Sequence, residues 1–139
     1  MGFGALSCQL LLAAATTSAK WIIPGARWRA TDGTLVNAHA GGVTIDQETG
    51  KFFWFGEYKI EGQEEGGGVS VYSSDDLATW EPHGLALEPI EGHPIISPDD
   101  IIQRPKVVYS EGTGQYHVRH QYRLISELSL TCLDVVARR

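Results

Sequence analysis

The segment 51–59, with the sequence Lys-Phe-Phe-Trp-Phe-Gly-Glu-Tyr-Lys, constrains the fold of this chain more than any other. Its successive aromatic residues from Phe52 to Phe55 would point alternately to the two faces of a β-sheet. Both faces of this strand then need cover, which predicts a sheet with other parts of the chain packed on each side. Glu57 follows Gly56 at the strand end. There it either lines a ligand cleft or is a solvated charge.

Strand and turn signals follow one another at short intervals after Lys20, and no helical period is sustained, which predicts an all-β fold. Tight turns are predicted at residues 31–34 and 46–50, which contain Asp and Gly. Around the aromatic strand, further strands are predicted at residues 43–45, 69–74 and 84–88. Four strands joined by short turns are typical of one blade of a β-propeller.

Two connections in this first blade carry specific expectations. Residues 61–68 are so polar and so rich in glycine that we expect an exposed, flexible loop. In residues 73–80, Ser and Asp side chains are expected to hydrogen-bond to their own backbone, while Leu77 and Trp80 pack back onto the sheet. We interpret Trp80, like Trp28 and Trp54, as core packing rather than as a platform for a sugar ring.

A second blade is predicted to begin at residues 103–109, with a glycine turn at 110–114 and a strand at 115–118. From His120 the sequence changes character, and residues 122–139 contain no Gly or Pro and could form a weak helix. A propeller cannot close with one blade and part of another, because each blade buries its faces against its neighbours. We therefore divide the chain into a partial propeller at 20–119 and an aberrant tail at 120–139, as in a truncated or mis-spliced gene product. A genuine short protein capped by a C-terminal helix is the alternative.

The N-terminal residues 1–19 are predicted to be a secretory signal peptide. An apolar run over residues 5–15 is followed by small residues up to Ala19, and it is shorter than the roughly 20 apolar residues that span a bilayer. Because no Lys or Arg precedes the run, a short N-terminal helix is the alternative. Removing the signal would leave Cys132 without Cys8, so the two cysteines make no disulfide framework. We expect a secreted, extracellular protein with no membrane segment.

Charge and composition narrow the function further. The chain has 139 residues, which is enough for one domain. Its 17 acidic and 11 basic side chains give a net charge of −6. The basic surface expected of a nucleic-acid-binding protein is therefore absent. The 5 histidines lack the spacing and the Cys/His clustering of a zinc site. We predict no metal, no cofactor, no nucleic-acid partner and a monomer that acts on a neutral substrate.

Four linked segments of the sequence carry a resemblance to a known family. Residues 37–43, 53–59, 71–80 and 101–109 resemble, in order and with natural spacing, the first blade and the opening of the second in glycoside hydrolase family 43. The resemblance covers roughly residues 25–118 and is strongest to the galactan 1,3-β-galactosidase branch. It implies a fragment, about one and a half blades, of a five-bladed propeller whose central cavity holds the sugar. It also implies inverting hydrolysis, in which an acid and a base roughly 6.5–9.5 Å apart act on opposite faces of the sugar.

The same resemblance assigns three site residues. His39 stands where most of the family has the aspartate base, a loss that the galactosidase branch shares, and Glu57 matches a glutamate that binds the sugar. Gln103 falls at the position of the glutamate that tunes the acid, and a neutral amide there cannot raise the pKa of a neighbour. The general acid would lie in a third blade, which this chain does not contain.

Three functions remain open at this point. The first is an exo-acting hydrolase of β-1,3-galactan or arabinogalactan, as the full-length family member, with this chain truncated and inactive. The second is a carbohydrate-binding propeller without activity, which Gln103 and the missing base favour. The third is a chain without function because it cannot fold. In the first two the partner is a polysaccharide or an oligosaccharide.

Overall fold

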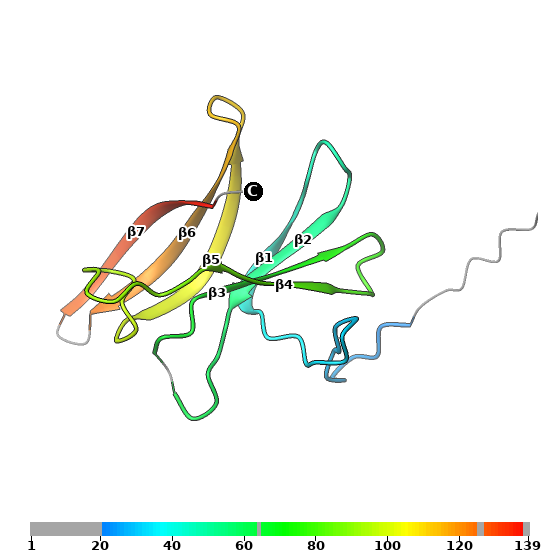
Figure 1. Ribbon diagram of the computed structural model, residues 1–139, viewed down its shortest axis with the longest axis horizontal. Coiled ribbons are helices and arrows are strands. Elements are labelled where there is room, and N and C mark those ends of the chain that lie inside the picture. The colour runs from blue at the N-terminus through cyan, green and yellow to red at the C-terminus, as the bar shows by residue number, and fades with distance from the viewer. Residues whose placement is uncertain (1–20, 64, 125–126, 138–139) are drawn as a thin grey trace, which may run out of the picture.

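The computed structural model describes residues 21–63, 65–124 and 127–137, with side chains as far as His120. The signal peptide expected over residues 1–19 lies outside the described residues. The described part of the chain is all-β, as predicted, and contains two antiparallel sheets (Figure 1). None of the described residues forms a helix that could cross a membrane.

The first sheet is a four-stranded antiparallel meander. It contains β1 (His39–Ile45), β2 (Phe52–Glu57), β3 (Val69–Ser74) and β4 (Glu81–Leu87), which neighbour one another in chain order. Gly50 in the β1–β2 turn has a positive φ of 71°, as does Gly33, at 85°, in the turn that precedes β1. The four strands predicted for the first blade are therefore confirmed.

The aromatic strand β2 is covered on both faces, as its alternation predicts. Phe53 and Phe55 lie on the face that packs against the second sheet. Phe52 and Trp54 lie on the opposite face, against Trp80 and the segment that precedes β1. On that face the Trp54 ring lies edge-on to the Trp80 ring, with ring centroids 5.2 Å apart. The interpretation of Trp54 and Trp80 as core packing is confirmed.

The second sheet contains β5 (Ile101–Ser110), β6 (Gln115–Leu124) and β7 (Glu127–Ala137). The first two form the predicted hairpin. The expectation of a weak helix in residues 122–139 is wrong, because β7 pairs with β6 from Leu124↔Glu127 to Tyr116↔Ala137. A strand in this position supplies hydrogen-bond partners for the backbone groups along the open edge of β6, which a helix could not do. Since β6 also continues through His120, the start expected for the tail falls within a strand.

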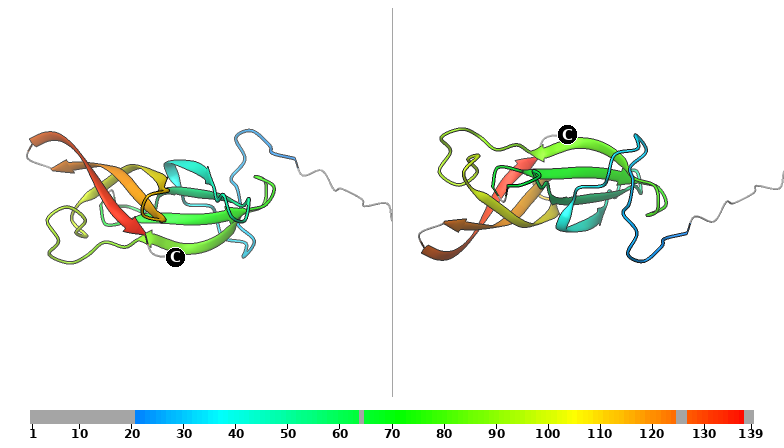
Figure 2. Two further views of the ribbon diagram at one scale, coloured as in Figure 1. Left: turned by 90° about the horizontal axis from the view of Figure 1, so that it is seen from above. Right: turned by 90° about the horizontal axis from the view of Figure 1, so that it is seen from below.

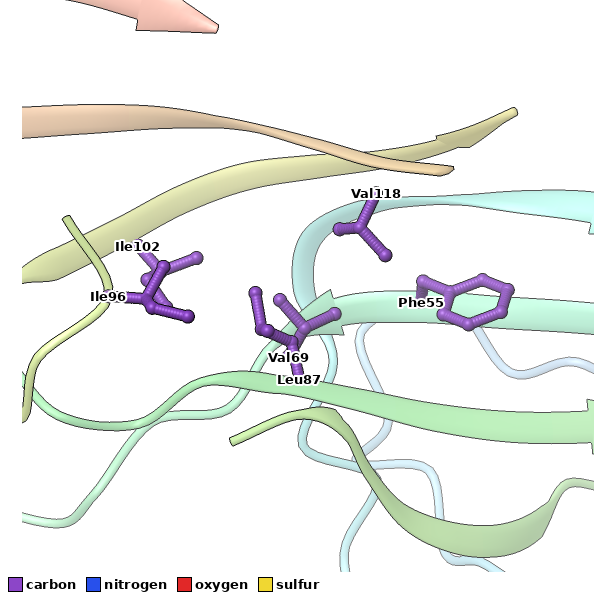
Figure 3. Packing of buried hydrophobic residues seen from close by; sticks show 6 residues of the cluster. All are labelled: Phe55, Val69, Leu87, Ile96, Ile102 and Val118. Atoms are coloured by element: carbon purple, nitrogen blue, oxygen red, sulfur yellow. The ribbon is translucent and has the colours of Figure 1, made fainter. Parts of the chain in front are cut away.

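The two sheets pack around one shared apolar layer. Strand β5 lies against β1 and β2, and the two sheets cross when seen from above or below (Figure 2). Figure 3 shows side chains from both sheets, and one from the β4–β5 connection, meeting between them. The buried members of this layer are Phe55, Val69, Leu87, Ile96, Ile102 and Val118.

A polar contact joins the two sheets at the C-terminal end of β1. The hydroxyl of Thr49 donates to one oxygen of Asp46 at 2.6 Å, and the hydroxyl of Tyr116 in β6 donates to the other at 2.8 Å. These two hydrogen bonds, with the Thr49 bond the stronger influence, lower the pKa of Asp46 below its ordinary value of 3.8. Asp46 therefore stays ionised where the second sheet meets the β1–β2 turn.

The turn at residues 73–80 is held by its own side chains, as predicted. Ser74 accepts from the amide of Leu77 at 2.9 Å, and Asp76 accepts from the amide of Thr79 at 2.7 Å. Trp80 is buried, but the expectation that Leu77 packs back onto the sheet is wrong. Leu77 is 39% exposed and has φ 61°, because this turn needs a left-handed residue at its tip.

The glycine-rich loop at residues 61–68 differs from the expectation of a wholly exposed, flexible segment. Its first residues are exposed, but Gly66 and Gly68 pack against other backbone. A Cβ at Gly66 would lie 2.8 Å from the Pro98 carbonyl oxygen, and one at Gly68 would overlap the carbonyl oxygen of Leu87. The glycines are thus needed for close approach rather than for flexibility.

Candidate functional site

Strand β1 begins with a β-bulge directly after His39. His39 pairs with Glu57 and Gly42 pairs with Phe55, so the ladder omits Ala40 and Gly41 between them. Ala40 has φ 47°, which is rare for a residue with a side chain. A Cβ on Gly41 would overlap the carbonyl oxygen of Phe55, so only glycine fits there. Such bulges re-aim a neighbouring side chain and are frequent beside active sites.

Strand β5 contains a second bulge of the same form, directly after Gln103. Gln103 pairs with Gln121 and Lys106 with Arg119, and Arg104 between them has φ 49°. Pro105 completes this bulge and has no amide hydrogen to give to a ladder. In both β1 and β5 a predicted site residue is therefore followed by a left-handed residue. Backbone strain of this kind persists only where surrounding structure enforces it, and it clusters at functional sites.

Glu57 ties the β5 bulge to the first sheet. Its Oε1 accepts the backbone N–H of Arg104 at 2.7 Å, and its Oε2 pairs with Lys59 Nζ at 2.7 Å. Only 5% of Glu57 is exposed, so the alternative of a solvated strand-end charge is wrong. The carboxylate is held by an ammonium and a backbone donor, which are the partners that a buried charge requires.

Lys106 makes the reciprocal tie from the second sheet. Its Nζ donates to the carbonyl oxygen of Gly41 and, at 3.5 Å, to that of Ala40. Each bulge is therefore held by a side chain of the other sheet. We call this region, residues 39–42, Glu57 and residues 103–106, the bulge junction.

The bulge junction brings together all three residues that the sequence assigned to a site. His39 is the ladder partner of Glu57, and Glu57 binds the amide next to Gln103. His39 is exposed, Gln103 is half-buried and Glu57 is buried. Sequence reasoning did not identify Lys106 or Arg104 as members of this site. The sequence offered no local signal for them, because their partners in β1 and β2 lie far away along the chain.

A cavity of about 390 Å³ opens beside His39. Trp28 and Trp54 stand in its wall, and their rings meet edge to face with centroids 5.4 Å apart. A larger cavity of about 570 Å³ lies between the sheets near Asp46 and Tyr116 and does not reach the bulge junction. Within residues 21–120, no group of three His, Cys, Asp or Glu side chains is placed to hold a metal ion.

Comparison with known proteins identifies the fold to which these sheets belong. No family model and no curated protein matches the sequence. Among solved structures, the chain matches an exo-β-1,3-galactanase from Phanerochaete chrysosporium, solved with galactose, at a TM-score of 0.69 and 32% identity over 76% of this chain. A family 43 β-1,3-galactosidase, solved with galactodeoxynojirimycin, matches with 39% identity and a TM-score of 0.64 over 72% of this chain. The chain belongs to glycoside hydrolase family 43.

This family 43 chain spans only part of its relatives. It covers 24% of the Phanerochaete chrysosporium enzyme and 29% of the β-1,3-galactosidase. An exo-β-1,3-galactanase from Clostridium thermocellum is similar at 31% identity and a TM-score of 0.63, over 73% of this chain and 21% of that enzyme. The resemblance of the sequence to the galactan-degrading branch of the family is thus confirmed by structures.

Proposed function

We propose that the chain forms part of the sugar site of a glycoside hydrolase that acts on β-1,3-galactan, and that the bulge junction binds a galactose residue. The observation that carries the proposal is the meeting of His39, Glu57 and Gln103, from three strands of two sheets, at one place. Two structures of the Phanerochaete chrysosporium relative contain galactose or β-1,3-galactotriose, which favours a galactose unit as ligand.

The side chains at the junction suit a neutral sugar. The amide of Gln103 and the ring of His39 can each donate to and accept from hydroxyl groups. Glu57 is an acceptor fixed in place by Lys59 and by the Arg104 amide, so it loses little freedom when a ligand binds. An arrangement of this kind selects the positions of hydroxyl groups rather than a charge.

We further propose that the two sheets are about one and a half blades of a five-bladed, inverting enzyme, and that the 139-residue chain alone binds sugar without cleaving it. The resemblance places the general acid in a third blade, and Gln103 is uncharged at the acid-tuning position. A bound sugar would therefore meet no group able to protonate its leaving oxygen.

Titration of the ¹⁵N-labelled chain with β-1,3-galactobiose tests the binding proposal, with β-1,4-galactobiose as the matched control. We expect amide shifts at Gly42 and near Gln103 with the 1,3-linked sugar, weakened by His39→Ala and unchanged by His83→Ala. His83 is exposed and hydrogen-bonded to Ser73, away from the junction. No shifts at the junction, or equal shifts with both sugars, would refute the proposal. Release of galactose during long incubation would refute the absence of cleavage.

A non-catalytic carbohydrate-binding protein is the second candidate, and the neutral Gln103 is the observation that favours it. A chimera separates the two, in which residues 25–118 replace the equivalent part of the Phanerochaete chrysosporium enzyme. A hydrolase origin predicts that the chimera cleaves β-1,3-galactan and that Gln103→Glu in the chimera raises kcat. Binding without cleavage in both forms would support the second candidate, and an unchanged kcat would show that Gln103 does not occupy the tuning position.

A further inference from the structure

We propose that Lys106 is a positioning residue of the bulge junction, which holds the bulge of β1 and so keeps His39 in register with Glu57. Only the part of this proposal that concerns sugar binding rests on the proposed function. The part that concerns the β1 backbone stands on the hydrogen bonds of Lys106 alone.

The carbonyl groups of the β1 bulge need a donor from outside the first sheet. The β1–β2 ladder passes from the pair His39 and Glu57 to the pair Gly42 and Phe55, so Ala40 and Gly41 fall outside it. Lys106 Nζ donates to the carbonyl oxygens of both omitted residues. An ammonium has three donors and can serve two acceptors that diverge, which a single amide could not.

The Lys106 side chain is held in position along its whole length. Lys106 is the first residue of β5 to rejoin the ladder after the second bulge, where it pairs with Arg119. A Cβ on Gly42 would lie 3.5 Å from Lys106 Cδ and 3.6 Å from its Nζ, so the lysine stem crosses directly over Gly42. The Lys106 side chain therefore lies within van der Waals distance of this part of β1.

Loss of this tie has a defined consequence for His39. The left-handed conformation of Ala40, at φ 47°, is unfavourable and depends on the contacts around it. If the bulge relaxed into a continuous ladder, β1 would slip by one residue at its start. A slip of one residue moves a side chain to the opposite face of a sheet. His39 would then lose its place opposite Glu57.

Three variants test the proposal in the full chain. Lys106→Met removes the ammonium but keeps an apolar stem, Lys106→Arg restores a cationic donor, and Lys51→Met is the matched control. Lys51 pairs with Asp75 at 3.4 Å on an exposed surface outside the junction. Because Lys106 is exposed and Glu57 still ties the other bulge, the Lys106 variants should keep the fold. The midpoint of urea unfolding checks this directly.

Amide hydrogen exchange is the first measurement. Exchange at Gly41 and Gly42 should become about threefold to tenfold faster in Lys106→Met, with recovery in Lys106→Arg and no change in Lys51→Met. Unchanged exchange in Lys106→Met, or no recovery with arginine, would overturn the proposal. Faster exchange throughout the chain would also overturn it, since it would show a general loss of stability.

Affinity for β-1,3-galactobiose is the second measurement. We expect the Kd to rise about threefold to tenfold in Lys106→Met and to stay constant in Lys51→Met. If the unaltered chain binds no sugar, the proposed function fails, while the exchange measurement still decides the role of Lys106. If exchange changes and affinity does not, Lys106 holds the β1 bulge but does not position His39 for the sugar, and that part of the inference is refuted.

Discussion

Replacement of Glu57 by alanine tests the structural reasoning most directly, because this carboxylate ties β2 to the bulge of β5. In Glu57→Ala the backbone N–H of Arg104 loses an acceptor that lies at 2.7 Å. A donor left unsatisfied away from water costs about 1–3 kcal/mol, and this one is partly buried, which favours the lower half of that range. Lys59 loses its partner too, but its side chain is 38% exposed and can return to water, which adds at most about 1 kcal/mol. We expect the free energy of unfolding to fall by about 2 kcal/mol.

Two further variants separate the contributions in this prediction. Glu57→Gln keeps an acceptor for Arg104 and loses only the charge, and Lys59→Met loses only the ion pair, so each should cost about 1 kcal/mol or less. Urea unfolding followed by tryptophan fluorescence gives the free energies, since Trp54 and Trp80 lie in the first sheet's core. Equal losses in Glu57→Ala and Glu57→Gln would show that charge, and not the acceptor for Arg104, governs stability. An alanine variant as stable as the unaltered chain would refute the tie itself.

Three other changes have definite expected outcomes. The pKa of Asp46 is lowered on folding, so the contribution of this carboxylate to stability is complete above its ordinary pKa of 3.8 and is lost as the pH falls through the folded pKa. Tyr116→Phe removes one of the hydrogen bonds that lower this pKa. Thermal melts of Tyr116→Phe should therefore show a weaker loss of Tm in acid than those of the unaltered chain. An equal acid loss in both proteins would contradict this. Leu77→Asn should raise the free energy of unfolding by about 0.5–1 kcal/mol, because asparagine tolerates the left-handed conformation of this exposed residue better than leucine. A lower urea midpoint for Leu77→Asn than for the unaltered chain would contradict this expectation. Gly41→Ala should lower the free energy of unfolding by about 3 kcal/mol or more, since the new Cβ would overlap the backbone of β2. Gly112→Ala, whose Cβ would meet open space, should be close to neutral in the same urea assay.

The features that sequence predicted well are those set by neighbours along the chain. Alternation from Phe52 to Phe55 fixes which aromatic side chain faces which side of β2, whatever covers them. The turn around Ser74 and Asp76 is likewise local, because its hydrogen bonds join residues two or three apart. The hydrophobicity of Leu77 predicts burial, which is wrong because the geometry of the turn decides its position.

The features that sequence could not supply depend on contacts between distant segments. The sequence predicts a flexible loop before β3, because the neighbours that its glycines meet, Pro98 and Leu87, come from other parts of the fold. The absence of turn residues predicts a weak helix where the structure has β7, although Leu128, Leu130 and Cys132 alternate with polar residues as in a strand. His39, Glu57 and Gln103 were found through the family resemblance, but the ties that place them were not.

The reciprocal ties at the bulge junction bear on when the site can form during synthesis. The first sheet is complete in sequence at Leu87, before any residue of β5 has been made. Chains begin to fold from the N-terminus as they emerge, so the first sheet can pair its strands while Lys106 and the Arg104 amide do not yet exist. The start of β1 must then wait for β5 to select its bulged form. Recognition of a ligand at His39 would be acquired only when the growing chain has passed this point, however early the sheet that carries His39 has folded.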